Sequence, residues 1–324
     1  MMNCAVFIDH KGTIFQPSVE EGVTWELERK GVPGKLTFKV LKDMVINFQE
    51  GDPCMMSVDG VQLFYGFVFT KKRDKDGVIS VTAYDQLRYL KNKTNFQYEG
   101  KKASDVVRMV AEDVQLQCGE IEDTAFVIEQ RTEAGKTLFD IIQNALDLTV
   151  QNAGEMYVLY DDYGKLTLKN IASLKLDLLI DAETGENFDY QTSIDNETYN
   201  QVWLYYEDQD SGERKNYVVQ DGDHINKWGV LRKFESIDEK TNGQAKAEAL
   251  LKLYNQKTRN LTVKGCFGDT RVRGGSLVMV SLDLGDIIAN SYLMVEKVKH
   301  TFKESMHTMD LTLRGGAPGG DFVV

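Results

Sequence analysis

Short segments in which apolar and polar residues alternate, each followed by a glycine or aspartate turn, fill most of this chain. Residues 23–27 and 36–40 alternate in this way, and the turn at 31–34 separates them. The 324 residues include 27 glycines and only four prolines, and many glycines between short apolar runs indicate many turns. Successive side chains of a β-strand point to opposite faces of its sheet. The pattern therefore predicts a strand-rich protein built from small barrels or sandwiches.

The first part of the chain continues this pattern without a break. Further strands are expected at residues 55–58, 63–70 and 78–84, with Gly and Asp turns between them. Short strands at this spacing predict a first small β-barrel domain over residues 1–95.

Helical spacing then replaces the alternation. Valines recur on one helical face within residues 104–114, and Ser104 is the expected N-cap. A second helix is expected to begin at Thr137, which opens a capping-box sequence. A hairpin is expected over residues 156–169. Residues 96–190 are therefore predicted to form a small α+β insert domain.

Alternating segments return in the last third of the chain. Strands are expected at residues 201–206 and 215–219, and a helix at about 243–256. The segment that follows is strand-like up to a glycine-rich C-terminus, which is expected to be flexible. This pattern predicts a second β-barrel domain with one helix over residues 191–324. The expected fold class is mainly β with an α+β insert, giving two small β-barrel domains and a smaller helix-containing domain.

Two of the strand-rich segments resemble each other. Residues 36–39 read Leu-Thr-Phe-Lys and precede Gly51, while residues 261–264 read Leu-Thr-Val-Lys and precede Gly275 at nearly the same distance. Each copy continues into an aromatic strand and then an alternating strand. We interpret this similarity as an internal duplication. The alternative is that any two Greek-key barrels look alike at this level.

Charge, cysteine spacing and the N-terminus argue against several classes of protein. The formal net charge is −12, which disfavours specific nucleic-acid binding because phosphates attract Lys and Arg. The cysteines lie too far apart for a zinc site, at Cys4, Cys54, Cys118 and Cys266. The N-terminus does not read as a signal peptide, and no run reaches the roughly 18 apolar residues of a membrane span. We expect synthesis in a reducing cytosol, without signal-peptide secretion or membrane insertion.

No pattern assigns a catalytic, cofactor-binding or metal-binding residue. The stretch 208–213 begins like a calcium loop, but a glycine occupies a ligand position. His300 and His307 flank an expected hairpin and are interpreted as a surface pair; the other histidines are His10 and His224. No nucleophile has an associated base, and nothing singles out two of the 50 carboxylates. The chain is expected not to be an enzyme, with a cell-wall hydrolase kept as an alternative.

Three surface features bear on binding. The basic run at residues 71–75 lies at a hairpin tip and is interpreted as a solvated turn, with contact to an anionic partner as the alternative. The glycine-rich stretch 271–275 lacks the phosphate-loop spacing and precedes an expected strand. Trp203, Tyr205 and Trp228 suggest a carbohydrate-binding module if they are exposed, or domain and subunit contacts if they are buried. The binding residues stay unassigned.

Taken in order, several motifs resemble the XkdQ/YqbQ family. The resemblance rests on residues 31–40, 50–53, 63–68, 81–90 and 137–142. Each motif is weak by itself, but their order and spacing are fairly specific and span nearly the whole chain. Members of this family are hub proteins of contractile-tailed phages, and of the defective prophages and tail-like bacteriocins of Gram-positive bacteria.

The resemblance implies a structural baseplate hub similar to that of T-even phages. Such a hub is a homotrimer with two tube-like barrels per chain, and it lies between the hexameric tail tube and the trimeric central spike. The implied partners are the tail tube protein, the spike protein, a LysM-type tail protein, wedge proteins and the tape-measure protein. No catalytic residue and no cofactor is implied. Together with the duplication, this predicts that three chains place six barrels in one ring, around an acidic or neutral lumen.

Overall fold

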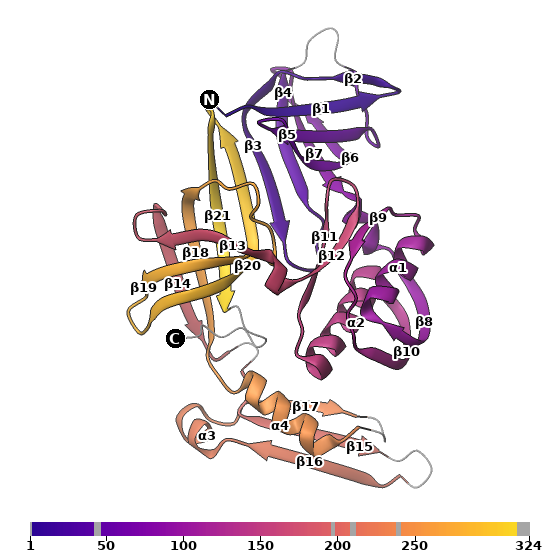
Figure 1. Cartoon of the computed structure of the whole chain (residues 1–324), viewed down its shortest axis with the longest axis vertical. Helices are drawn as coiled ribbons and strands as arrows, with labels where there is room; N and C mark the ends of the chain where they lie inside the picture. The colour runs from indigo at the N-terminus through magenta and orange to yellow at the C-terminus, as the bar shows by residue number, and fades with distance from the viewer. Residues whose placement is uncertain (1, 42–46, 196–197, 208–211, 238–240, 316–324) are drawn as a thin grey trace. The chain divides into compact units, whose positions relative to one another are not determined.

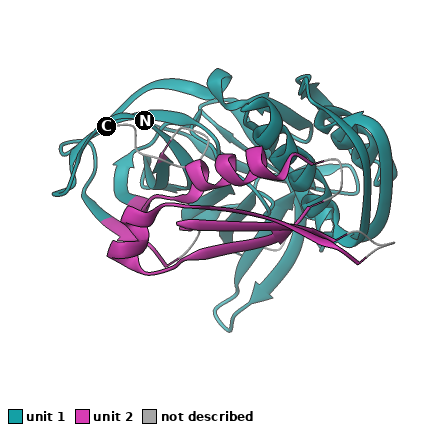
Figure 2. Ribbon diagram, turned by 90° about the horizontal axis from the view of Figure 1, so that it is seen from below, with its two compact units in different colours: residues 1–189, 262–314, 324 teal, residues 190–261, 315–323 magenta. Residues whose placement is uncertain are grey.

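The computed structural model describes residues 2–41, 47–195, 198–207, 212–237 and 241–315 (Figure 1). Among these residues, strands far outnumber helices, which confirms the mainly β fold class. The chain divides into two compact units (Figure 2). Unit 1 holds residues 1–189 and 262–314, and unit 2 is centred on residues 190–261.

The first seven strands of unit 1 form an antiparallel array. Their bounds are β1 (Cys4–His10), β2 (Thr13–Phe15), β3 (Val19–Glu28), β4 (Lys35–Leu41), β5 (Pro53–Val58), β6 (Val61–Arg73) and β7 (Val78–Asp85). Their spatial order is β3-β4-β7-β6-β5-β1-β2. The alternation that predicted them is the alternation of burial: Leu36, Phe38 and Val40 are buried, while Lys39 is exposed. These three side chains belong to a core that also contains Trp25.

A segment with both helices and strands follows the first seven strands. Its elements are η1 (Gln86–Lys91), β8 (Lys93–Lys102), α1 (Ala103–Asp113), β9 (Cys118–Ile121), β10 (Val127–Thr137), α2 (Leu138–Ala153), β11 (Tyr157–Asp161), β12 (Leu166–Asn170) and η2 (Ile171–Leu174). The capping box of α2 is confirmed, because Thr137 and Asp140 each accept a hydrogen bond from the other's backbone N–H. The N-cap of α1 is Lys102 and not Ser104, because the Asp105 carboxylate accepts a hydrogen bond from the Lys102 N–H. The helix therefore begins at Ala103, earlier than expected.

After the insert, the chain returns to the large sheet of unit 1. The strands are β13 (Lys175–Asp181), β14 (Asn187–Ser193), β18 (Thr258–Phe267), β19 (Leu277–Asp283), β20 (Ile288–Lys303) and β21 (Met306–Gly315). β14 and β18 each run across the boundary between the two units. The spatial order of the six strands is β14-β18-β21-β20-β19-β13.

The internal duplication is present in this strand order. Replacing β3, β4, β7, β6, β5 and β1 by β14, β18, β21, β20, β19 and β13 keeps both the order along the chain and the order in space. The hydrogen bonds repeat as well: Gly51 donates to the Val68 carbonyl at 2.8 Å, and Gly275 donates to the Val295 carbonyl at 2.7 Å. Both glycines have positive φ, +90° and +93°. Only the outer strands differ, since β1 is antiparallel to β5 while β13 is parallel to β19.

The two copies are not separate barrels, which corrects one part of the expected fold. β20 extends past β19 and pairs with β3 over Lys297↔Glu28 to Phe302↔Val23, so both copies join one 13-stranded sheet. Among the described residues, no pairing closes this sheet on itself. The long final half of β20 is therefore the element that joins the two copies (Figure 1).

Unit 2 is a small sheet covered by a helix. Its elements are β15 (Gln201–Glu207), β16 (Arg214–Gln220), α3 (Gly222–Trp228), β17 (Arg232–Ser236) and α4 (Gly243–Tyr254). Val202 and Leu204 pack against Ala247 and Leu250 of α4, which is the helix expected at 243–256. The seven-residue α3 was missed, although Asp221 is an evident N-cap. The division into domains at 1–95, 96–190 and 191–324 stays a prediction.

Candidate functional site

The structure brings no chemical site together from the residues that the sequence analysis considered. Within the described ranges, no three His, Cys, Asp or Glu side chains are placed to hold a metal ion. The four cysteines are free thiols. Residues 208–211 of the calcium-like stretch lie outside the described residues. None of the described helices is long and apolar enough to cross a bilayer.

His300 and His307 do face each other, with His300 fully buried and His307 partly buried. Their Nδ1 and Nε2 atoms are 2.9 Å apart, and His300 Nε2 donates to the Val272 carbonyl at 3.0 Å. Since Nε2 of His300 carries the proton, its Nδ1 accepts from His307. His300 is fully buried and stacks on Trp25 with ring centroids 5.0 Å apart. The interpretation as a surface pair is therefore wrong for His300, which packs on Trp25 in the core, while His307 keeps part of its surface exposed.

Burial controls the charge of both rings. Burial, and then the neighbouring charge of His307, lowers the pKa of His300 to about 3, and burial lowers the pKa of His307 to about 4. Both rings are neutral at neutral pH and act as packed, hydrogen-bonded parts of the core.

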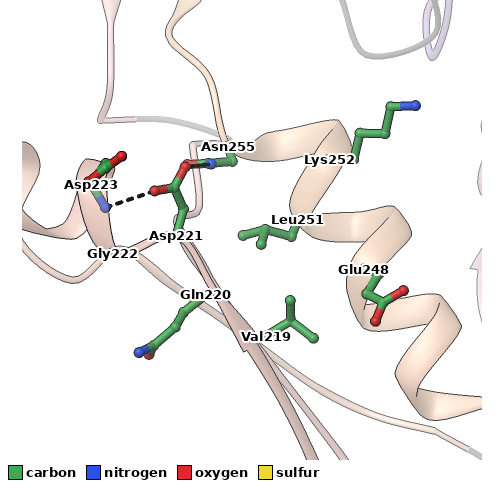
Figure 3. Close-up of a pocket in the computed structure, with 9 residues that line it drawn as sticks. All are labelled: Val219, Gln220, Asp221, Gly222, Asp223, Glu248, Leu251, Lys252 and Asn255. Carbon is green, nitrogen blue, oxygen red and sulfur yellow. Dashed lines mark hydrogen bonds between the residues drawn. The ribbon is translucent and has the colours of Figure 1, made fainter.

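A surface pocket lies in unit 2 beside α3 and α4 (Figure 3). Asp221 accepts from the N–H groups of Asp223 and His224, and Asn255 donates to its second oxygen at 2.6 Å. The His224 N–H, then the Asn255 amide, lower the pKa of Asp221. Asp221 is thus committed to capping a helix and is not available as one member of an acid–base pair.

Unit 1 contains two interacting carboxylates, Asp85 and Asp161, that no sequence pattern singled out. Asp85 ends β7 and accepts from the N–H groups of Gly34 (2.9 Å) and Leu87 (3.0 Å). Burial, and then the charge of Asp161, raises the pKa of Asp85. Burial also raises the pKa of Asp161 to about 6, although the Gly164 N–H donates to it at 2.8 Å. The sequence carried no signal for this pair, because its members are 76 positions apart and meet only through the fold.

These carboxylates do not form a hydrolase site. Asp85 is 3% exposed, and backbone N–H groups occupy both of its oxygens. The second oxygen of Asp161 is also buried. Arg273 reaches the Asp161 carbonyl and lies over the Tyr160 ring at 4.2 Å, so the second copy packs over the pair. Neither acid is therefore open to a substrate.

Replacing Asp161 by Asn should therefore stabilise the protein, and more so at high pH. The pKa of Asp161 is higher in the folded chain, so its ionisation costs stability as pH rises through about 6. We expect Asp161→Asn to gain about 2 kcal/mol over the wild type between pH 4.5 and pH 8, measured by urea denaturation. Asp76→Asn, at an exposed position in the turn between β6 and β7, is the control. An equal gain at both pH values would contradict the assignment.

The aromatic residues considered for sugar binding are only partly brought together. Trp203 and Tyr205 lie on the face of the β16-β15-β17 sheet opposite α4, with Phe234 between them at centroid distances of 6.2 and 4.9 Å. Trp228 is elsewhere and stacks on His224. The Arg232 guanidinium lies over the Trp203 ring at 4.9 Å, which is where a sugar would stack.

The basic run and the glycine-rich loop have structural places in unit 1. Lys71, Lys72 and Arg73 end β6, and the turn to β7 follows them. The 271–275 stretch precedes β19, as expected, and Arg271 pairs with Asp269 and Asp177. The β3–β20 joint adds ion pairs that the sequence analysis missed: Arg29 with Glu296 at 2.9 Å, and Lys297 with Glu28 at 3.0 Å.

Comparison with known proteins decides the family. The family model described as YqbQ-like matches residues 23–314, nearly the whole chain. This chain belongs to the YqbQ-like family. The Bacillus subtilis (strain 168) protein XkdQ of the phage-like element PBSX is 29% identical over 315 residues, which are 93% of this chain and 94% of that protein. The family predicted from the ordered motifs is thus confirmed.

Solved structures show how far the fold of this YqbQ-like protein extends. The 43 kDa tail protein of prophage MuSo2 from Shewanella oneidensis has a TM-score of 0.72 at 13% identity, and the match covers 98% of this chain and 100% of that one. The E. coli c3393 protein has a TM-score of 0.55 at 11% identity, covering 95% and 76%. That protein is described as a type VI secretion component similar to the T4 tail proteins gp27 and gp5. At these identities, the likeness concerns the fold.

Proposed function

We propose that this chain is a structural hub at the baseplate of a contractile phage tail or tail-like particle, where it joins the hexameric tail tube to the trimeric central spike. The observation that carries the proposal is the duplicated strand order of unit 1. A chain with two equivalent sheet modules presents six modules when three copies assemble. Such a ring matches a sixfold tube on one side and a threefold spike on the other.

The relatives support this role. XkdQ is a phage-like element protein, and the MuSo2 protein is a prophage tail protein. We infer that this chain likewise belongs to a tail baseplate and is not a free enzyme. Its partners would be two further copies of itself, the tail tube protein, the central spike, a LysM-type tail protein, wedge proteins and the tape-measure protein. In the ring, the sheet modules would surround an acidic or neutral lumen.

The alternatives are less well supported. A tail-associated cell-wall hydrolase needs two accessible carboxylates, and Asp85 and Asp161 are enclosed. A carbohydrate-binding module needs open aromatic faces, and Arg232 and Arg214 cover those of Trp203 and Tyr205. We therefore propose that the chain has no enzymatic activity.

Reconstruction of the purified particle tests the proposal. We expect three copies of this chain in one ring between tube and spike, and we expect deletion of its gene to abolish complete particles. Six copies per ring, or normal particles without the chain, would contradict the hub role. A zymogram of the purified chain on peptidoglycan adds a second test, in which a band that is lost on mutating one Asp or Glu would support the hydrolase.

A further inference from the structure

The two copies are joined within the chain by the pairing of β20 with β3. The equivalent part of the first copy, the end of β6, has no such partner strand among the described residues. In the second copy, β20 runs past β19 and pairs with β3, beginning where the Arg29 N–H donates to the Glu296 carbonyl at 2.8 Å. The equivalent hydrogen bonds place Val68 at the position of Val295. Phe69 to Arg73 of β6 therefore correspond to the residues of β20 that receive β3.

This part of β6 has one open edge. Residues 70–73 pair with β7 on one side, while the pairing with β5 ends at Phe67. Among the described residues, no strand lies on the other side, and all four side chains are exposed. Lys71 Nζ donates a hydrogen bond to the Phe48 carbonyl. In the second copy, His300 donates to the equivalent carbonyl, that of Val272, and β20 still pairs with β3 there. The Lys71 contact therefore leaves the edge free.

The strand that fits this edge is β14. By the duplication, β14 holds the position of β3, with β18 on one side as β4 lies beside β3. β14 is the last strand in the order of the large sheet, so its other edge has no partner strand within the part of the chain that the structure describes. Phe188 at its start is 41% exposed. Open strand edges pair readily with other chains unless they are covered.

Charge favours the same match. The open edge of β6 carries Lys71, Lys72 and Arg73, whereas Glu186, Asp189 and Asp195 lie in or beside β14. The internal β3–β20 joint also contains ion pairs between its strands, in which each strand contributes one basic and one acidic side chain: Arg29 pairs with Glu296, and Lys297 pairs with Glu28.

We propose that residues Thr70–Arg73 of β6 pair in antiparallel register with β14 of a second copy of this chain. The contact rests on the proposed hub function and would repeat between copies what β20 and β3 do within one. Alternation of the internal and intermolecular joints would close a ring of six sheet modules after three chains. The basic run at 71–75 then lies at an interface and not in a solvated turn.

Cysteine cross-linking in the assembled particle tests this contact. In a Cys118→Ser background, which removes the exposed thiol, Lys72→Cys with Gln191→Cys should give covalent dimers and trimers of the chain on oxidation. Either substitution alone, or Lys101→Cys in exposed β8 combined with Gln191→Cys, should give none. A particle that contains three copies without this cross-link overturns the contact but leaves the hub role standing. Cross-linking of the Lys72→Cys variant to a different protein also overturns the contact, and absence of the chain from particles overturns both.

A charge exchange gives a second readout. Lys72→Glu with Arg73→Glu should reduce incorporation into particles about tenfold, equivalent to about 1.4 kcal/mol, because like charges then face each other. Adding Asp189→Lys and Asp195→Lys to the same chain should restore incorporation, since each copy presents both edges. Restoration supports the pairing, and an equal or larger defect in the fourfold variant overturns it.

Discussion

Substitution of Gly274 by alanine should destabilise unit 1 by about 3 kcal/mol, because it wedges apart the two copies of the duplication. A Cβ atom at Gly274 would overlap the backbone of Glu28 and Arg29 at the end of β3. This is the point at which the Arg29 N–H meets the Glu296 carbonyl. Backbone atoms in a paired strand cannot turn aside as a flexible side chain can, so the strand itself must shift.

Denaturant unfolding and amide hydrogen exchange together measure this effect. The amides of β3 and of the final half of β20 should lose protection more than those of β4 and β7. Gly222→Ala is the matched control, because a Cβ there meets no atom within 4 Å and the glycine needs no positive φ. The control should change stability by no more than about 1 kcal/mol. If the amides of β3 kept their protection in the Gly274→Ala variant, the predicted separation of β3 from β20 would be contradicted.

Acid should destabilise the protein through the buried histidine pair. The pKa values of His300 and His307, about 3 and about 4, lie below the ordinary value near 6.5 of an unfolded chain. As pH falls below about 6.5, the unfolded chain binds protons that the folded chain refuses, so stability is complete above that pH and is lost below it. At pH 5, the neutral His300 ring should cost the fold about 2 kcal/mol, and the partly buried His307 ring should cost less, because solvent screens it.

His300→Gln isolates this contribution, since glutamine keeps a donor for the Val272 carbonyl but does not titrate. The variant should be less stable than the wild type at pH 7.5, and the difference should shrink by about 2 kcal/mol at pH 5. Ile141→Val, in the separate core of the α+β segment, should lower stability equally at both pH values. The variant must be compared with the wild type at the same pH, because the ionisation of Asp161 changes the stability of both proteins with pH, in the direction opposite to that of the histidines. A constant difference for His300→Gln would refute the neutral buried pair.

Local patterns were enough for the elements of this fold. The alternation in residues 36–40 identified β4 because side chains of one parity face the core, and the Thr137 capping box identified α2 because both partners are local in sequence. Where two local signals competed, the prediction failed: Asp105 displaced the expected cap at Ser104. The short α3 was missed because seven residues carry too little periodicity.

The sequence by itself determined the mainly β class, the family and the duplication, since strand periodicity, motif order and the Gly51 and Gly275 turns are all written in short stretches of chain. Only the tertiary structure decided what depends on distant pairing. It joined the two expected barrels into one sheet through β3 and β20, enclosed Asp85 with Asp161, and buried His300. These contacts are set by which strand edges meet and which faces are covered, and periodicity along the chain is the same whether a strand edge is open or paired.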